Sequence, residues 1–196
     1  MKHRASRELF NHWNSLRGAR LAPERAEINP AAIRGALSDT VILARDERGE
    51  TIFRLAGTRV CALFGRELKN QPFGPLWDAR SREDIETLIE HAGAESCGVV
   101  AGAEALVEDG APVAVELLVL PLFHRGTSDG RLIGTLAPLS APAWLGLRTV
   151  SALRLMSWRA VGPQIDDVVV PRFVDLPDEP RVHGDSGLVI HHGGRP

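Results

Sequence analysis

Few residues of this sequence have the types and spacing that chemistry at a site requires. Cys61 and Cys97 are the only two cysteines, and no local pattern pairs either one with a histidine that could activate it as a nucleophile. The chain contains no Gly-x-Ser-x-Gly motif and no glycine-rich phosphate loop. We therefore expect no enzymatic activity and no catalytic residues.

Histidine and carboxylate side chains could bind a metal. His183, Asp185, His191 and His192 lie close together near the C-terminus, but their spacing matches no established metal motif. A polar tail is the favoured interpretation. The sequence therefore predicts neither a metal site nor a cofactor.

The composition excludes several classes of protein. The chain has 196 residues, with 23 Lys and Arg against 25 Asp and Glu, so no excess of positive charge is available to neutralise a nucleic-acid backbone. Two cysteines are too few for a disulfide framework, and the N-terminus lacks the apolar core of a signal peptide. No apolar run approaches the length that spans a bilayer. We expect a soluble, cytoplasmic protein without a nucleic-acid partner.

An amphipathic helix is predicted over residues 6–17, with Gly18 as its stop. One apolar stripe runs along it, and these are the predicted partner-binding residues: Leu9, Phe10, Trp13 and Leu16. Such a stripe needs a surface to lie on. Self-association into a homodimer and the docking of a signalling protein are both consistent with it.

The middle of the chain alternates between strand and helix patterns. Runs of β-forming residues separated by turn residues, at Gly49, at Asp109-Gly110 and at Ser128 to Gly130, predict five antiparallel strands. Two helices interrupt them, a short one over Thr58 to Phe64 and a longer one after Ser81, where Ser81 and Asp84 form a capping-box pattern. The fold class is therefore α+β.

Beyond residue 142 the pattern is weak. Residues 148–158 have some alternating apolar character but no decisive period. We divide the chain into an N-terminal helix and connector over 1–35, a core over 36–141, and a partly irregular C-terminal extension over 142–196.

The segment IFRLAGTRVCALFGRELKNQPF, residues 52–73, resembles the second strand, first helix and following turn of a PAS domain. The whole chain is similar to a family of single-domain PAS-like proteins common in alphaproteobacteria. The resemblance covers residues 6–140 and rests on five short motifs in order: W-x3-R-G from Trp13, P-x-R from Pro23, Asn29-Pro30, FRLAGT from Phe53 and GREL from Gly65. It implies a five-stranded antiparallel sheet with a helical insert between strands 2 and 3, and a role in signal transduction.

Two cofactors used by PAS relatives do not match this sequence. Light-sensing relatives bond a flavin to a helix cysteine, but Cys61 lacks the flanking residues of that motif and lies one helix too early. Haem-binding relatives take an iron ligand from the longer helix, where His91 lies. His91 is one position off the apolar stripe of that helix, so we expect it at the surface.

The resemblance implies an apolar pocket between the sheet and the insert. The candidate ligand-binding residues are apolar side chains on the strands and helices that would enclose it: Phe53, Leu55, Leu63, Phe73, Ile85, Ile89, Val115 and Leu117. Strand alternation places Phe53 and Leu55 on one face, and Val115 and Leu117 on one face. An ordinary filled core uses the same residue types.

Two functional hypotheses follow. In the first, the protein is a sensor in which a small apolar ligand or a partner shifts the population of two arrangements of the N-terminal helix or the tail. In the second, it is an interaction adaptor with a solid core and no ligand. In both cases the signal passes by non-covalent contact.

Overall fold

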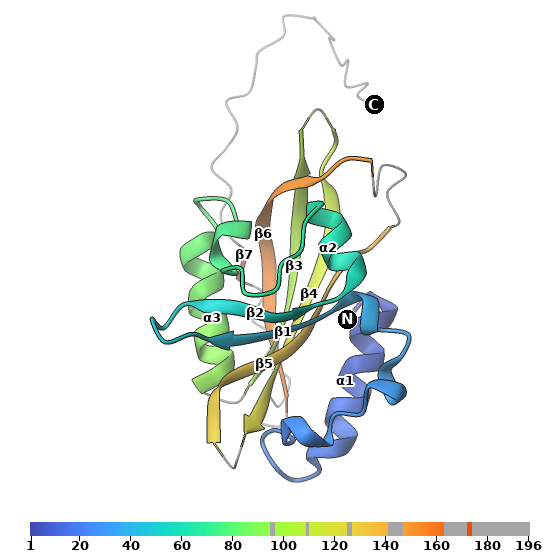
Figure 1. The fold of residues 1–196 in the computed structure, drawn as a ribbon, viewed down its shortest axis with the longest axis vertical. Helices are drawn as coiled ribbons and strands as arrows, with labels where there is room; N and C mark the ends of the chain where they lie inside the picture. The colour runs from blue at the N-terminus through green and yellow to red at the C-terminus, as the bar shows by residue number, and fades with distance from the viewer. Residues whose placement is uncertain (95–96, 109, 125–126, 141–146, 163–171, 174–196) are drawn as a thin grey trace, which may run out of the picture.

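One antiparallel sheet organises the molecule, with strand order β2-β1-β5-β4-β3-β6-β7 (Figure 1). The computed structural model describes residues 1–94, 97–108, 110–124, 127–140, 147–162 and 172–173. The strands are β1 Thr40–Arg45, β2 Thr51–Ala56, β3 Gly98–Val107, β4 Val113–His124, β5 Thr127–Pro138, β6 Val150–Val161 and β7 Arg172–Phe173. The α-helices are α1 Arg4–Arg17, α2 Thr58–Phe64 and α3 Arg82–Ala94. This is the predicted α+β, PAS-like arrangement.

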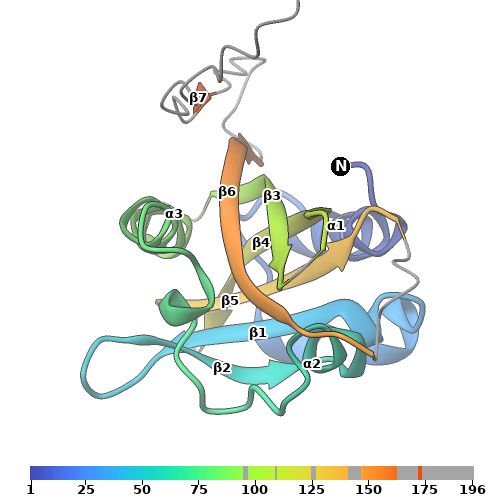
Figure 2. The same cartoon turned by 90° about the horizontal axis from the view of Figure 1, so that it is seen from above.

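Each face of the sheet carries its own core. Helices α2 and α3 cover what we call the inner face, where their apolar residues pack on strand residues such as Leu117 and Val119. Helix α1 covers the outer face, where it packs on Leu118 and Leu120. Seen from above, α3 and α1 lie on opposite sides of β3 and β4 (Figure 2). The alternation of side chains along β4 produces this division.

Helix α1 forms as the sequence predicts. The Nδ1 atom of His3 accepts a hydrogen bond from the Ala5 amide at its start, and Gly18 follows its end with a φ of 56°. Such an angle is accessible to glycine and resisted by other residues. Leu9 and Trp13 are fully buried against the outer face. The stripe therefore lies on the chain's own sheet.

The β1–β2 hairpin contains a β-bulge that the sequence pattern does not show. Leu43 pairs with Phe53, whereas Ile42 pairs with Leu55, so Arg54 is an extra residue in β2. A bulge reverses the face on which the following residue lies. Phe53 is buried as predicted, but Leu55 is 43% exposed and does not share its face.

The insert between β2 and β3 is hydrogen-bonded to two strands on opposite sides of the sheet, β2 and β6. The amide of Phe53 donates to the carbonyl of Gln71, and the amide of Asp78 donates to the carbonyl of Leu153 on β6. The hydroxyl of Ser81 accepts a hydrogen bond of 2.9 Å from the Leu155 amide. The residue predicted to open a capping box thus also receives a bond from a distant strand.

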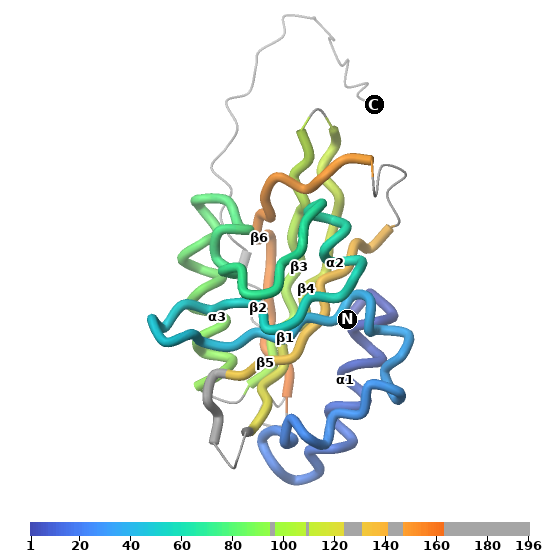
Figure 3. The backbone as a smooth tube through the Cα atoms, viewed as in Figure 1, coloured from blue at the N-terminus to red at the C-terminus, as the bar shows by residue number. Residues whose placement is uncertain are grey.

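The five predicted strands are present, and β6 continues the sheet beyond them. It pairs with β3 along its whole length, from Gly98↔Val161 to Val107↔Val150, as Figure 3 shows for the orange and green tubes. Strand β5 begins at Thr127, so Ser128 to Gly130 lie within a strand and not in the predicted turn. Asp109, the first residue of the other predicted turn, lies outside the described residues.

Candidate functional site

Seven of the eight predicted ligand-binding residues meet in the inner-face core. Phe53, Leu63, Phe73, Ile85, Ile89, Val115 and Leu117 are all buried members of one cluster. The rings of Phe53 and Phe73 have centroids 5.5 Å apart. Leu55 lies outside the cluster because of the bulge at Arg54. The strands and helices that the sequence assigned to the pocket therefore do come together.

Trp77 is the residue of this core that sequence reasoning missed. Its ring lies 5.8 Å from that of Phe73, with an interplanar angle of 57°, and the residue is 1% exposed. Its Nε1 is buried and has no hydrogen-bond partner among the described residues. No pattern around PLWDAR distinguishes this tryptophan from one that would pack without a polar role. Within the described part of the chain, the Trp77 indole is thus a donor of the inner-face core without an acceptor.

The predicted partner-binding residues divide into two pairs. Leu9 and Trp13 are fully buried, and the Nε1 of Trp13 donates to the Pro121 carbonyl. They belong to the outer-face core and are not available to a partner, because the apolar stripe of α1 packs against the sheet of the same chain. Phe10 and Leu16 are partly exposed, and only these two stay candidates for contact with another molecule.

The cysteines and His91 occupy unexceptional positions. Burial raises the pKa of the Cys61 thiol, and the nearby Glu67 carboxylate reinforces the shift, so Cys61 stays protonated at neutral pH. His91 is exposed, as predicted. Within the described ranges no group of His, Cys, Asp and Glu side chains is arranged to hold a metal ion. The histidines at positions 183, 191 and 192 lie outside those ranges.

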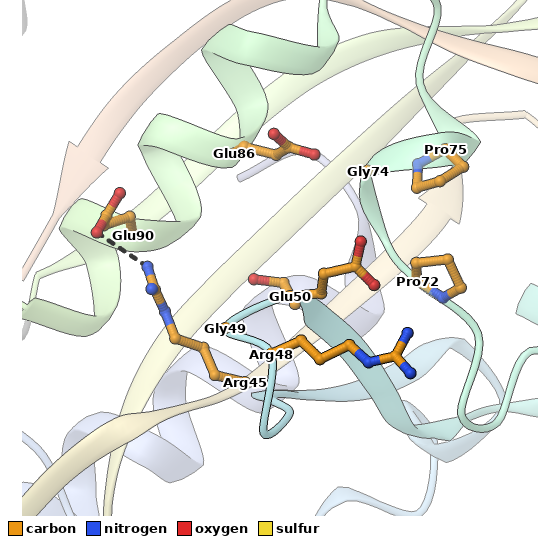
Figure 4. Close-up of a pocket in the computed structure, with 10 residues that line it drawn as sticks. Arg45, Arg48, Gly49, Glu50, Pro72, Gly74, Pro75, Glu86 and Glu90 are labelled. Carbon is orange, nitrogen blue, oxygen red and sulfur yellow. Dashed lines mark ion pairs between the residues drawn. The ribbon is translucent and has the colours of Figure 1, made fainter.

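A charged surface pocket of about 310 Å³ opens beside the β1–β2 hairpin (Figure 4). Arg45, Arg48 and Glu50 line it from the hairpin, while Glu86 and Glu90 line it from α3. The Arg45 guanidinium lies 3.0 Å from the Glu90 carboxylate, and both side chains are well exposed. Exposed pairs of this kind contribute little to stability. The sequence patterns did not indicate this pocket, because the residues come from separate elements.

Two buried carboxylates lie near the start of α1. Glu116 on β4 accepts hydrogen bonds from the Lys2 amide at 2.6 Å and the His3 amide at 3.0 Å. Burial opposes its charged form, but these bonds and one from Ser6 outweigh burial and lower its pKa. Glu116 therefore stays ionised and holds the beginning of α1 on the sheet.

The environment of Asp39 disfavours its charged form, whereas that of Glu116 favours it. Its carboxylate is buried, and neither oxygen has a hydrogen-bond donor within the described part of the chain. The nearest cation is Arg59, whose Nε lies 3.4 Å from Oδ1. Burial raises the pKa of Asp39, and Arg59 and His3 offset this only in part. A negative charge at Asp39 is thus energetically unfavourable in the folded protein.

None of the helices in the described ranges is both long and apolar enough to cross a membrane. No curated protein matches the chain. A similar solved structure is the crystal structure of the PAS domain of a protein from Colwellia psychrerythraea. It is 18% identical, the similarity covers 56% of this chain and 97% of that chain, and the TM-score is 0.40.

A family model described as a PAS domain, PAS_5, matches residues 1–137. The match includes α1 together with the sheet and the helical insert. It spans well over half of the chain. The chain therefore belongs to the PAS domain family, whose members serve as sensory and signalling modules.

Proposed function

We propose that this PAS domain senses a small ligand bound in its inner-face core and passes the signal on by non-covalent contact with a partner. The observation that carries the proposal is the Trp77 indole, whose buried Nε1 has no acceptor among the described residues. Buried donors in native proteins are nearly always paired, and an unpaired one costs about 1–3 kcal/mol. An acceptor on a bound molecule would remove that cost.

The surroundings of Trp77 define the class of ligand. Phe53 and Phe73 lie in the same cluster, together with aliphatic residues of the sheet and α3. A small, largely apolar molecule with one hydrogen-bond acceptor fits this chemistry. Because the inner-face side chains already pack on one another, binding would separate the insert from the sheet. That displacement is the signal we propose.

A second function, an interaction adaptor without a ligand, is favoured by the packing of the predicted pocket. The seven residues that meet there are each at most 5% exposed. A core that is filled by its own side chains needs no ligand for stability. In that case the working surface is on the exterior, where Phe10 and Leu16 are partly exposed.

The two functions are separated by native mass spectrometry of protein purified without added ligand, followed by thermal-shift measurements with a panel of small apolar acceptors. The sensor predicts either a bound mass or a rise in melting temperature. Trp77→Phe should remove that rise, because it deletes the Nε1 donor. Trp13→Phe is the matched control, since its indole is already paired with Pro121 and the ligand response should persist. A mass equal to that of the polypeptide alone, together with no rise in melting temperature for any compound, would contradict the sensor and favour the adaptor.

Three finer expectations accompany this proposal. Membership in the alphaproteobacterial single-domain group, a cytoplasmic location and self-association each stay predictions. For self-association, Phe10 and Leu16 are the remaining residues of α1 that a second copy could contact.

A further inference from the structure

Gly102 lies in the interior of β3 among valines and alanines, where a β-forming residue would be expected. Glycine weakens a strand, and in strand interiors it often marks a bulge or a place where another group approaches closely. Among the described residues, a Cβ atom at position 102 would have one neighbour within 4 Å, the Ser157 hydroxyl at 3.1 Å. The space above Gly102 is therefore largely open.

This space is a hollow of about 200 Å³. Val100, Gly102 and Glu116 line it from β3 and β4, Ser157 and Arg159 line it from β6, and Met1 and Lys2 line it from the chain leading into α1. Val100 belongs to the outer-face cluster, and Glu116 binds the segment that leads into α1, so the hollow opens on the outer face. Val115 of the inner-face cluster lines it as well. Pockets for drug-sized ligands measure about 300–1,000 Å³, so this one suits a smaller molecule.

The charges around the hollow favour an anion. Glu116, the carboxylate among its described lining residues, is 4% exposed and already accepts hydrogen bonds from the amides of Lys2 and His3. Neither the Lys2 ammonium nor the Arg159 guanidinium forms an ion pair with the described residues. A guanidinium presents a fork of donors that matches a carboxylate. Val100 and Leu139 supply apolar surface beside these cations.

We propose that the hollow over Gly102 is a second binding site, for a small carboxylate with an apolar body. The carboxylate pairs with Arg159 and Lys2, and the apolar body lies over Gly102 against Val100. The site goes beyond the proposed sensing of a ligand near Trp77 and does not depend on it. Because Glu116 holds the Lys2 amide, an occupant of the hollow also contacts the segment that anchors α1.

The test is a titration with phenylacetate followed by ¹H–¹⁵N NMR, with hexanoate as a second probe. We expect saturable shifts of the amides of Gly102, Ser157 and Lys2 and unchanged shifts of the Trp77 indole. Phenethylamine, which has a similar body and the opposite charge, should bind at least tenfold more weakly. Arg159→Gln should weaken phenylacetate about tenfold. The exposed Arg54 lies at the far edge of the sheet, so Arg54→Gln should leave the affinity unchanged.

Gly102→Leu should abolish binding by filling the hollow, with retained dispersion of the spectrum showing that the variant folds. If that variant does not fold, Arg159→Gln decides the question alone. The proposal is overturned if neither carboxylate shifts these amides in a saturable way, if phenethylamine binds as well as phenylacetate, or if Arg159→Gln has no effect. Shifts confined to the Trp77 indole would support the inner-face ligand and remove the second site.

Discussion

The Nε1 atom of Trp13 donates a hydrogen bond of 2.7 Å to the carbonyl oxygen of Pro121, 108 residues further along the chain. Trp13 is on α1 and Pro121 is on β4, so this bond fixes the helix to the outer face. Trp77 presents the contrasting case, since its equally buried Nε1 has no partner in the described ranges. The two indoles differ in hydrogen bonding while both are buried.

This contrast predicts the cost of replacing each tryptophan. Trp13→Phe loses ring volume and leaves the Pro121 carbonyl without its donor, whereas Trp77→Phe loses volume and removes an unpaired donor. We expect Trp13→Phe to be the more destabilising by about 1 kcal/mol, measured by urea denaturation of protein without ligand. Equal losses would mean that the Trp77 indole has found an acceptor in solution.

The bulge at Arg54 predicts unequal roles for two neighbouring apolar residues. Phe53 is fully buried and Leu55 is 43% exposed. Phe53→Ala should cost about 3–5 kcal/mol of unfolding free energy, and Leu55→Ala no more than about 0.5 kcal/mol. Urea denaturation of both variants checks this. A large loss for Leu55→Ala would show that β2 alternates regularly and that Leu55 faces the core.

Because Glu116 accepts the amides of Lys2 and His3, we expect the attachment of α1 to the sheet to depend on pH. The pKa of Glu116 is lowered in the folded state, so the stability that it contributes is present above its unfolded pKa and is lost as pH falls through the folded value. Glu116→Gln should therefore lower stability at pH 7 by about 1–3 kcal/mol and speed hydrogen exchange in α1. In strongly acidic solution the variant and the wild type should converge.

Glu104→Gln is the control for this prediction, because Glu104 is on the same sheet but is partly exposed and lies 3.9 Å from its nearest cation, Arg154. It should leave the exchange of α1 amides unchanged. Equal effects of the two variants would contradict the anchoring role of Glu116.

For Asp39 we expect the contribution to folding stability to change with pH in the opposite direction to that of Glu116. Its pKa is raised in the folded state, so its contribution favours the folded state below its unfolded pKa and is lost as pH rises through the folded value. Asp39→Asn should stabilise the protein at pH 7 by on the order of 1 kcal/mol and have little effect in acid. Arg59→Gln should destabilise at pH 7, because it removes the nearest cation. Thermal melts across pH measure both, and destabilisation by Asp39→Asn at pH 7 would refute this account.

The hydrogen bond from the Leu155 amide to Ser81 should contribute to the stability with which β6 is attached to the insert. Its hydroxyl accepts the Leu155 amide in a buried position, so Ser81→Ala leaves that amide unpaired and should cost about 1–3 kcal/mol. Ser151 is the matched control on β6 itself, since its hydroxyl donates to the Leu106 carbonyl at an exposed position. Ser151→Ala should change the free energy of unfolding by no more than about 0.5 kcal/mol. Equal urea midpoints for the two variants would contradict the proposed role.

Prediction from sequence succeeded where the determining interactions are local. The helix over 6–17, the hairpin turn at Gly49 and the stripe of α3 each depend on residues a few positions apart. For the site, the same local patterns identified seven of the residues that form the inner-face core. Trp77 was missed because the lack of an acceptor depends on every neighbour brought in from other elements.

The amino-acid sequence by itself determined the α+β class, the order of the elements up to β5 and the apolar stripes of α1 and α3, because periodicity and turn residues act over a few residues. Only the tertiary structure decided that the α1 stripe lies on the chain's own sheet, that Leu55 faces outward and that β6 completes the sheet beside β3. Each of these depends on pairing between segments far apart in the chain. A pattern shows that a surface must be buried, and the partner that buries it is selected by the whole fold.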